Sequence, residues 1–212
     1  MTRTHSENHR PYDNQTFGKI AYWLIRLNGA ICIVQIVAIA MAKGGVEAQY
    51  RTARQFLSGD IFVASVILFL ITIIVFLWWE YRATTNLLLL RGAQTVTPAG
   101  AIYWYFVPVA WFWKPYEAMR NLSNGYGVGD ESGVLLWWIL YWGRIAAAVV
   151  VSVVVSDPAL TMSEARIYAW SNNAIYAVAA MWCWAAARLV RAISAAEAGM
   201  LKQAWLTGST DE

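Results

Sequence analysis

The sequence predicts an all-α membrane protein: a polytopic helical bundle of four transmembrane helices plus a proline-broken re-entrant or interfacial hairpin. Of its 212 residues, 59% are hydrophobic and only 14% are charged, whereas soluble domains carry about 25% charged residues. Several runs of about 20 residues are almost free of charge, which is the length needed to cross a bilayer. These runs predict a membrane domain over residues 18–193.

A polar segment, residues 1–17, begins the chain and contains both histidines. Because the segment is polar and has no apolar run, we expect a disordered or surface tail. It does not resemble a signal peptide, which needs an apolar core close behind a basic start. The first span is predicted at about residues 20–42 and opens with Tyr22 and Trp23, which favour the membrane interface. Arg26 lies about two turns inside this span, where it either snorkels to the headgroups or pairs with a carboxylate in the bundle.

The second span, about residues 61–79, is the most uniformly apolar run of the chain. At 1.5 Å per residue it covers about the 30 Å of the hydrocarbon core. Glu80 follows the span directly. If the helix continues to Leu90, Arg82 and Asn86 lie four residues apart on one helix face.

The hairpin, about residues 98–120, begins at a Thr-Pro turn signal and contains an aromatic run from Tyr103 to Trp113. The run is short for a span. Pro108 and Pro115 interrupt it, since proline removes a backbone donor and disrupts the preceding helical turn. Irregular backbone at membrane depth must be covered by protein or line a cavity, so the pattern favours a re-entrant or interfacial hairpin over a full crossing.

The third and fourth spans are predicted at about residues 134–156 and 167–187. The third carries Arg144 well inside its apolar run. Ser163, with an acidic residue after it, is typical of the start of the last helix. Residues 194–212 follow as an amphipathic C-terminal tail.

The distribution of positive charge predicts the orientation, because Lys and Arg are enriched on the cytoplasmic side of membrane proteins. With four spans and residues 80–132 entirely inside, about ten Lys and Arg lie inside and about four outside. If the proline-broken segment crosses instead, the division becomes about eight to six. The sequence therefore favours four spans with both termini cytoplasmic.

The inventory of reactive side chains predicts no catalytic residue, metal site or cofactor. The predicted spans contain no histidine, and Cys32 and Cys183 are isolated thiols without neighbouring ligands. Arg144 is expected to need a partner, because charge inside a membrane is costly. Glu80 is the first candidate and Glu117 the second, in an ion pair that either fixes helix packing or binds a substrate.

A pattern of amide, aromatic and proline residues occupies residues 82–120: Arg82 with Asn86, Thr97-Pro98, Trp104, Phe106-Val107-Pro108, Pro115-Tyr116 and Met119-Arg120. The pattern resembles the bacterial membrane proteins that carry the domain of unknown function 4328, over about residues 60–190. Two positions depart from that family pattern, which usually has Asn in place of Trp111 and Trp near Ser123. The resemblance implies a multi-span bacterial membrane protein and supplies no known reaction.

Together these features predict an uncharacterised multi-pass membrane protein, a non-enzymatic accessory, scaffold or sensory subunit that acts through helix faces and a cytoplasmic hairpin. One alternative is a small oligomeric transporter or channel, and another is a membrane enzyme that acts on lipid headgroups. The expected partners are the lipid bilayer and either a partner protein or further copies of the chain, with no nucleic acid. The candidate polar cluster or ligand pocket consists of Glu80, Arg82, Asn86, Trp104, Pro108, Pro115, Tyr116, Glu117, Arg120 and Arg144.

Overall fold

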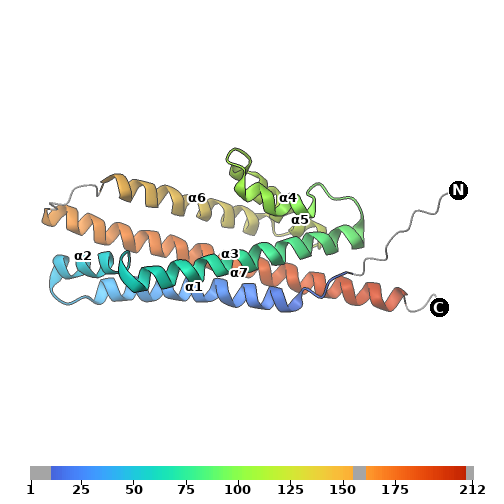
Figure 1. The fold of residues 1–212 in the computed structure, drawn as a ribbon, viewed down its shortest axis with the longest axis horizontal. Coiled ribbons are helices and arrows are strands. Elements are labelled where there is room, and N and C mark those ends of the chain that lie inside the picture. Colours follow the sequence, from blue (N-terminus) through green and yellow to red (C-terminus); the bar gives the residue numbers. More distant parts are fainter. Residues whose placement is uncertain (1–10, 155–160, 209–212) are drawn as a thin grey trace. The chain divides into compact units, whose positions relative to one another are not determined.

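The computed structural model describes residues 11–154 and 161–208. In these residues the regular structure is entirely helical, which confirms the all-α prediction (Figure 1). The elements are α1 (Gln15–Met41), α2 (Gly45–Gln55), α3 (Gly59–Arg91), α4 (Pro98–Tyr103), η1 (Trp104–Phe106), η2 (Ala110–Phe112), α5 (Lys114–Gly125), α6 (Glu131–Val154) and α7 (Met162–Gly208).

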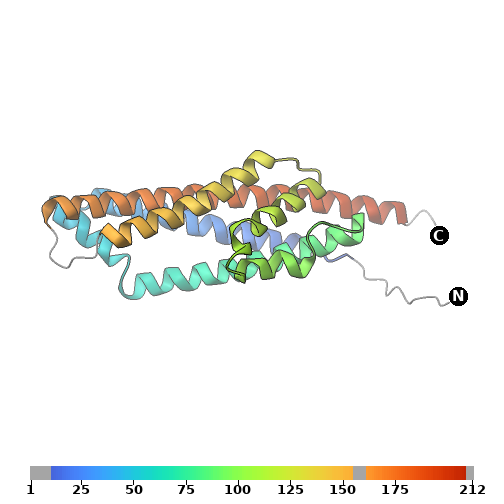
Figure 2. The ribbon, with the colours of Figure 1, turned by 90° about the horizontal axis from the view of Figure 1, so that it is seen from above.

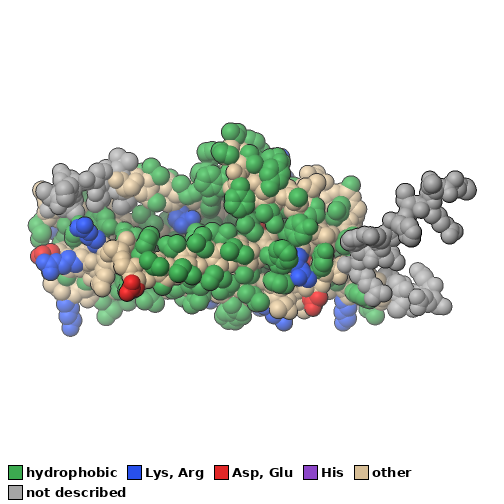
Figure 3. Space-filling model, viewed as in Figure 1, with side chains coloured by type: hydrophobic (Ala, Val, Ile, Leu, Met, Phe, Trp, Pro, Cys, Tyr) green, Lys and Arg blue, Asp and Glu red, His purple; other side chains and the backbone are tan. Residues whose placement is uncertain are grey.

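Within the described ranges, four helices are long and apolar enough to cross a membrane: α1, α3, α6 and α7. The α3 helix exposes apolar side chains such as Ile67, Leu70 and Ile74, and Figure 3 shows hydrophobic side chains along this stretch. A helix that is apolar on its outer as well as its inner face is typical of a membrane span. The chain is therefore a multi-pass membrane protein with four candidate spans, as the sequence predicts.

Two of the spanning helices are much longer than the apolar runs that predict them. The α3 helix has 33 residues and extends twelve residues past Trp79, to Arg91. At 1.5 Å per residue it is about 50 Å long, against about 30 Å of hydrocarbon. The α7 helix runs without interruption through the segment predicted as a C-terminal tail. Both helices therefore project beyond the hydrocarbon core.

The structure describes residues 11–14 of the segment before α1. Residues 1–10, including both histidines, lie outside the described residues. Within residues 11–14, Tyr12 and Asp13 are exposed, whereas Asn14 is completely buried. At the start of α7, Thr161 rather than Ser163 is the N-cap, because its hydroxyl accepts from the Glu164 amide at 3.4 Å.

The described residues form two compact units. Unit 1 contains residues 11–21, 75–134 and 189–208, and unit 2 contains residues 22–74 and 135–188, without the gap at 155–160. In unit 2, Ile39 of α1, Ala53 of α2 and Tyr168 of α7 form a buried apolar cluster. The short α2 helix is thus packed against two of the spans.

The hairpin in unit 1 is broken as the sequence predicts. Tyr103 to Trp113 forms no continuous helix, since α4 and η1 are separated from η2 by a turn that contains Pro108. Pro115 lies in the first turn of α5, where its missing N–H has no helical partner to lose. Figure 2 shows α4 and α5 diverging from this turn.

Three helices of unit 1 approach closely at Gly18 of α1. A Cβ atom at this position would lie 2.4 Å from Ser194 Oγ of α7 and 3.3 Å from Trp79 Nε1 of α3. The Trp79 indole N–H also donates to Ser194 Oγ at 3.0 Å. The small residue therefore allows α1, α3 and α7 to pack together with their polar atoms paired.

We expect Gly18→Ala to lower the unfolding temperature of the protein in detergent. The added methyl group displaces Ser194, and overpacking of this kind costs about 1–3 kcal/mol, more than the helix propensity gained by replacing glycine, about 1 kcal/mol. The control is Gly199→Ala in α7, where a Cβ meets no atom within 4 Å. That variant keeps or raises the unfolding temperature, and an equal effect of the two substitutions would contradict the close packing at Gly18.

Candidate functional site

The carboxylate of Glu197 on α7 is a buried, hydrogen-bonded acidic group of unit 1. Glu197 is only 2% exposed. Asn86 Nδ2 of α3 donates to its Oε1 at 2.6 Å, and Asn14 Nδ2 donates to its Oε2 at 3.2 Å. Burying a carboxylate is costly unless it is hydrogen-bonded, and here two amides from distant parts of the chain supply the bonds. We call Asn14, Asn86 and Glu197 the clasp.

Helical periodicity places Glu197 on the buried face of α7. Val190 and Ile193, seven and four residues earlier, are both completely buried, and residues at these spacings share one helix face. The acidic side chain therefore points into the packed interior of unit 1 rather than to the surface.

Asn86 uses its whole side-chain amide. Its Oδ1 accepts from the Tyr12 backbone N–H at 2.7 Å, and its Nδ2 donates to the Tyr12 carbonyl at 2.8 Å as well as to Glu197. Asn14 in turn donates to the Trp79 carbonyl of α3 at 3.2 Å. An asparagine has two N–H donors and one carbonyl acceptor, so Asn86 is fully engaged in holding the chain before α1 against α3 and α7.

Arg82 lies one turn before Asn86 and contacts the same N-terminal segment. Its Nη2 donates to the Asp13 carbonyl at 2.8 Å. Its guanidinium carbon lies 4.9 Å from the ring centroid of Tyr12 and 4.8 Å from that of Phe17, within the range of cation–π attraction. The Arg-x-x-x-Asn pair identified in the sequence therefore acts as a two-point attachment for the residues before α1.

The end of α5 docks on an adjacent face of this stretch of α3. The Tyr126 hydroxyl donates to the Ala83 carbonyl at 2.7 Å, and a Cβ at Gly125 would lie 2.3 Å from a Leu87 methyl group. Burial, together with the nearby Glu197 carboxylate, raises the pKa of Tyr126. The hydroxyl therefore stays protonated and remains a donor.

Glu80 is also completely buried, but it lies under the hairpin rather than in the clasp. The Glu80 carboxyl lies near the Tyr105 hydroxyl of η1. The Thr84 hydroxyl donates to the Glu80 backbone carbonyl at 2.9 Å. The η1 segment therefore lies near the point where the apolar run of α3 ends.

The other predicted site residues of the hairpin make local contacts. Lys114 Nζ lies 2.5 Å from Glu117 Oε2 and 5.7 Å from the ring centroid of Trp104. Arg120 pairs with Glu131 at 3.0 Å on the surface.

Within the predicted cluster the two prolines and Tyr116 complete the hairpin. Pro115 is buried, Tyr116 is half-buried and Pro108 is exposed. Of the predicted cluster, therefore, Asn86 belongs to the clasp and Arg82 adjoins it. The other predicted residues lie elsewhere.

Arg144 belongs to unit 2. Its guanidinium carbon lies 5.5 Å from the ring centroid of Phe69 on α3 and 5.0 Å from that of Trp182 on α7. Attraction to two aromatic faces offsets part of the cost of a charge inside the membrane. The expected pair with Glu80, which belongs to unit 1, stays a prediction.

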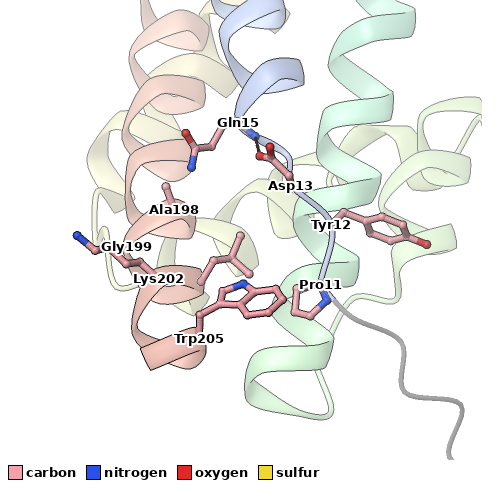
Figure 4. Close-up of a pocket in the computed structure, with 9 residues that line it drawn as sticks. Pro11, Tyr12, Asp13, Gln15, Ala198, Gly199, Lys202 and Trp205 are labelled. Carbon is pink, nitrogen blue, oxygen red and sulfur yellow. Dashed lines mark hydrogen bonds between the residues drawn. The ribbon is translucent and has the colours of Figure 1, made fainter. Parts of the chain in front are cut away.

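A pocket of about 530 Å³ adjoins the clasp, between residues 11–15 and the last turns of α7. Figure 4 shows the Trp205 indole pointing toward Pro11, and the Asp13 carboxylate accepting a hydrogen bond from the Gln15 backbone N–H. The volume of the pocket lies within the range of small-ligand pockets. The lining is mostly apolar and comprises Pro11, Tyr12, Asp13, Gln15, Ala198, Gly199, Leu201, Lys202 and Trp205.

Sequence reasoning missed Asn14 and Glu197, the two clasp residues at the ends of the membrane domain. Glu197 was expected in an amphipathic tail, although its spacing from Val190 and Ile193 already favoured a buried position. Asn14 offered no comparable signal, because it precedes α1 and its partner lies 183 residues away.

Comparison with known proteins identifies one family. A family model described as "Domain of unknown function (DUF4328)" matches residues 42–195, well over half of the chain. The match includes Arg82 and Asn86 but not Asn14 or Glu197. No curated protein and no solved structure matches the chain. Among the described residues, no group of three or more His, Cys, Asp or Glu could hold a metal ion.

The clasp predicts strong coupling between Asn86 and Glu197. Asn86→Asp places two carboxylates together and removes both N–H donors, so we expect the unfolding temperature to fall sharply, since hydrogen bonds to charged groups contribute about 1.5–3 kcal/mol each. Adding Glu197→Gln restores a donor–acceptor pair, and the double variant is more stable than Asn86→Asp alone. Gln55→Glu on the exposed end of α2 is the control for added charge. Strictly additive effects in this double-mutant cycle would show that the residues are not coupled.

Proposed function

We propose that this chain, which belongs to the family of the domain of unknown function DUF4328, is a non-enzymatic accessory, scaffold or sensory subunit of the membrane. The observation that carries the proposal is the clasp. It engages the buried Glu197 carboxylate and the Asn86 amide in joining the segment before α1 to α3 and α7. Among the described polar groups, those that most resemble a reactive site therefore hold three segments of the chain together.

The clasp also supports the proposed orientation. Asn14 precedes the first predicted span, Asn86 follows the second, at about 61–79, and Glu197 follows the fourth, at about 167–187. Direct contact among the three requires an even number of crossings between them, which fits four spans and disfavours a fifth crossing by the proline-broken segment. Together with the bias of Lys and Arg, this supports both termini and residues 80–132 on the cytoplasmic face of a bacterial cell membrane.

The pocket beside the clasp is the surface that best suits the partner of a scaffold protein. Its lining is mostly apolar, with Pro11 and Leu201, and accepts an apolar side chain of a partner. The exposed Lys202 favours an acidic side chain next to it. We infer that the partner is a protein whose exposed segment places an apolar anchor between residues 11–15 and α7. Buried apolar anchors of this kind dominate the affinity of protein interfaces.

A small oligomeric transporter is the second candidate, and Arg144 is the observation that favours it, because ionisable groups inside spans often mark transport pathways. The contacts of Arg144 with Phe69 and Trp182 give the residue a structural role as well. A headgroup-directed enzyme has less support, since Lys114 and Glu117 pair with each other.

The proposal predicts that a protein partner co-purifies in mild detergent at a fixed ratio, and that Leu201→Glu in the pocket reduces its recovery at least tenfold. The matched control is Ser132→Glu, an equal charge change at an exposed position away from the pocket. Recovery is measured by quantitative mass spectrometry, with the unfolding temperature of each variant checked in parallel. Recovery of a homo-oligomer alone would favour the transporter, and equal recovery with both variants would contradict the pocket as the partner surface.

A further inference from the structure

The turn of the hairpin exposes large apolar side chains. Phe106 is 71% exposed, Val109 69% and Phe112 56%, and Tyr103 and Trp113 beside them are also exposed. An apolar patch of this kind, contiguous along a short segment, normally marks an interaction surface in a folded protein.

The hairpin has its small residues inside and its large residues outside. Ala101 of α4, Ala110 of η2 and Ala118 of α5 are buried, and the first and last of these form one apolar cluster with Val96. A hairpin that packs in water has the opposite distribution, because burying large apolar side chains is what stabilises it. The outward placement of Phe106 and Val109 therefore indicates an apolar environment around the turn.

The contacts of η1 place the turn at the level where α3 leaves the membrane. The apolar run of α3 from residue 61 to Trp79 covers about the full hydrocarbon thickness at 1.5 Å per residue. Glu80 is the next residue, and its carboxyl lies near the Tyr105 hydroxyl of η1 within unit 1. Phe106 directly follows Tyr105 and so lies close to the same level.

The base of the turn has the residues that favour a membrane interface. The rings of Tyr103 and Trp104 are tilted by 34° with centroids 4.1 Å apart, and Lys114 Nζ lies 5.7 Å from the Trp104 ring centroid. Tryptophan and tyrosine are enriched at the headgroup level, and lysine extends its charged end toward it. The turn therefore has an apolar tip and an amphipathic base of aromatic rings and a Lys114–Glu117 ion pair.

We propose that the η1–η2 turn inserts Phe106, Val109 and Phe112 into the interfacial layer of the bilayer that α3 crosses. The occupant of this surface is lipid, because the turn lies near the level where the apolar run of α3 ends and because the aromatic residues at its base favour the headgroup layer. The inference is independent of the proposed scaffold function and stands if no protein partner binds the pocket.

The test uses a nitroxide spin label at Val109→Cys, in a variant with Cys32→Ala and Cys183→Ala, reconstituted in phosphatidylcholine–phosphatidylglycerol nanodiscs. Val109 is exposed, so the label displaces no packed atoms. Collisions with oxygen, which concentrates in lipid, and with a water-soluble nickel chelate report the surroundings of the label. The control is the label at Ala93→Cys, an exposed position in the connection after α3.

We expect oxygen collisions at Val109 to exceed nickel collisions, with the ratio several-fold higher than at Ala93. A nickel-dominated signal at Val109 would place the turn in water and overturn the proposal. Low collision rates with both reagents would show that protein, such as a second copy of the chain, covers the turn, and would also overturn it.

Discussion

The structure of unit 1 depends on the buried carboxylate of Glu197. A carboxyl group taken out of water needs hydrogen-bond donors, and the buried neighbours Val190 and Ile193 on this face of α7 are apolar. The donors come from Asn86 on α3 and from Asn14 before α1. Three chain segments that are far apart in the sequence must therefore meet at this point.

The lengths of the helices follow from the same requirement. Apolar runs of about 20 residues suffice to cross the hydrocarbon, yet α3 and α7 continue well beyond them. The extensions carry Asn86 and Glu197 past the membrane, where Arg82 secures the N-terminal segment and Tyr126 secures the end of α5. The family pattern at Arg82 and Asn86 thus has a direct structural meaning in this chain.

How much could be predicted from the sequence differs between the membrane domain and the site. The bilayer imposes length and apolar character on a span, so the four spans could be located, and the chemistry of proline marked the break at Pro108. The shared face of Arg82 and Asn86 followed from helical periodicity. Their partners could not be found in this way, because Asn14 and Glu197 lie 183 residues apart and periodicity describes one helix at a time. For Arg144 the sequence suggested a carboxylate, whereas the described contacts are two aromatic rings from other helices.

The most direct test of the account asks whether the three clasp segments lie on one side of the membrane. Single cysteines at Thr16, Ala93 and Gln203, which are exposed near the three segments, are compared with Ser58, after α2, in a chain without native cysteines. An impermeant thiol reagent is applied to intact cells. The account predicts that the first three cysteines resist labelling until the cells are opened and that the cysteine at Ser58 reacts at once. Opposite behaviour of the cysteines at Thr16 and Gln203 would contradict the clasp.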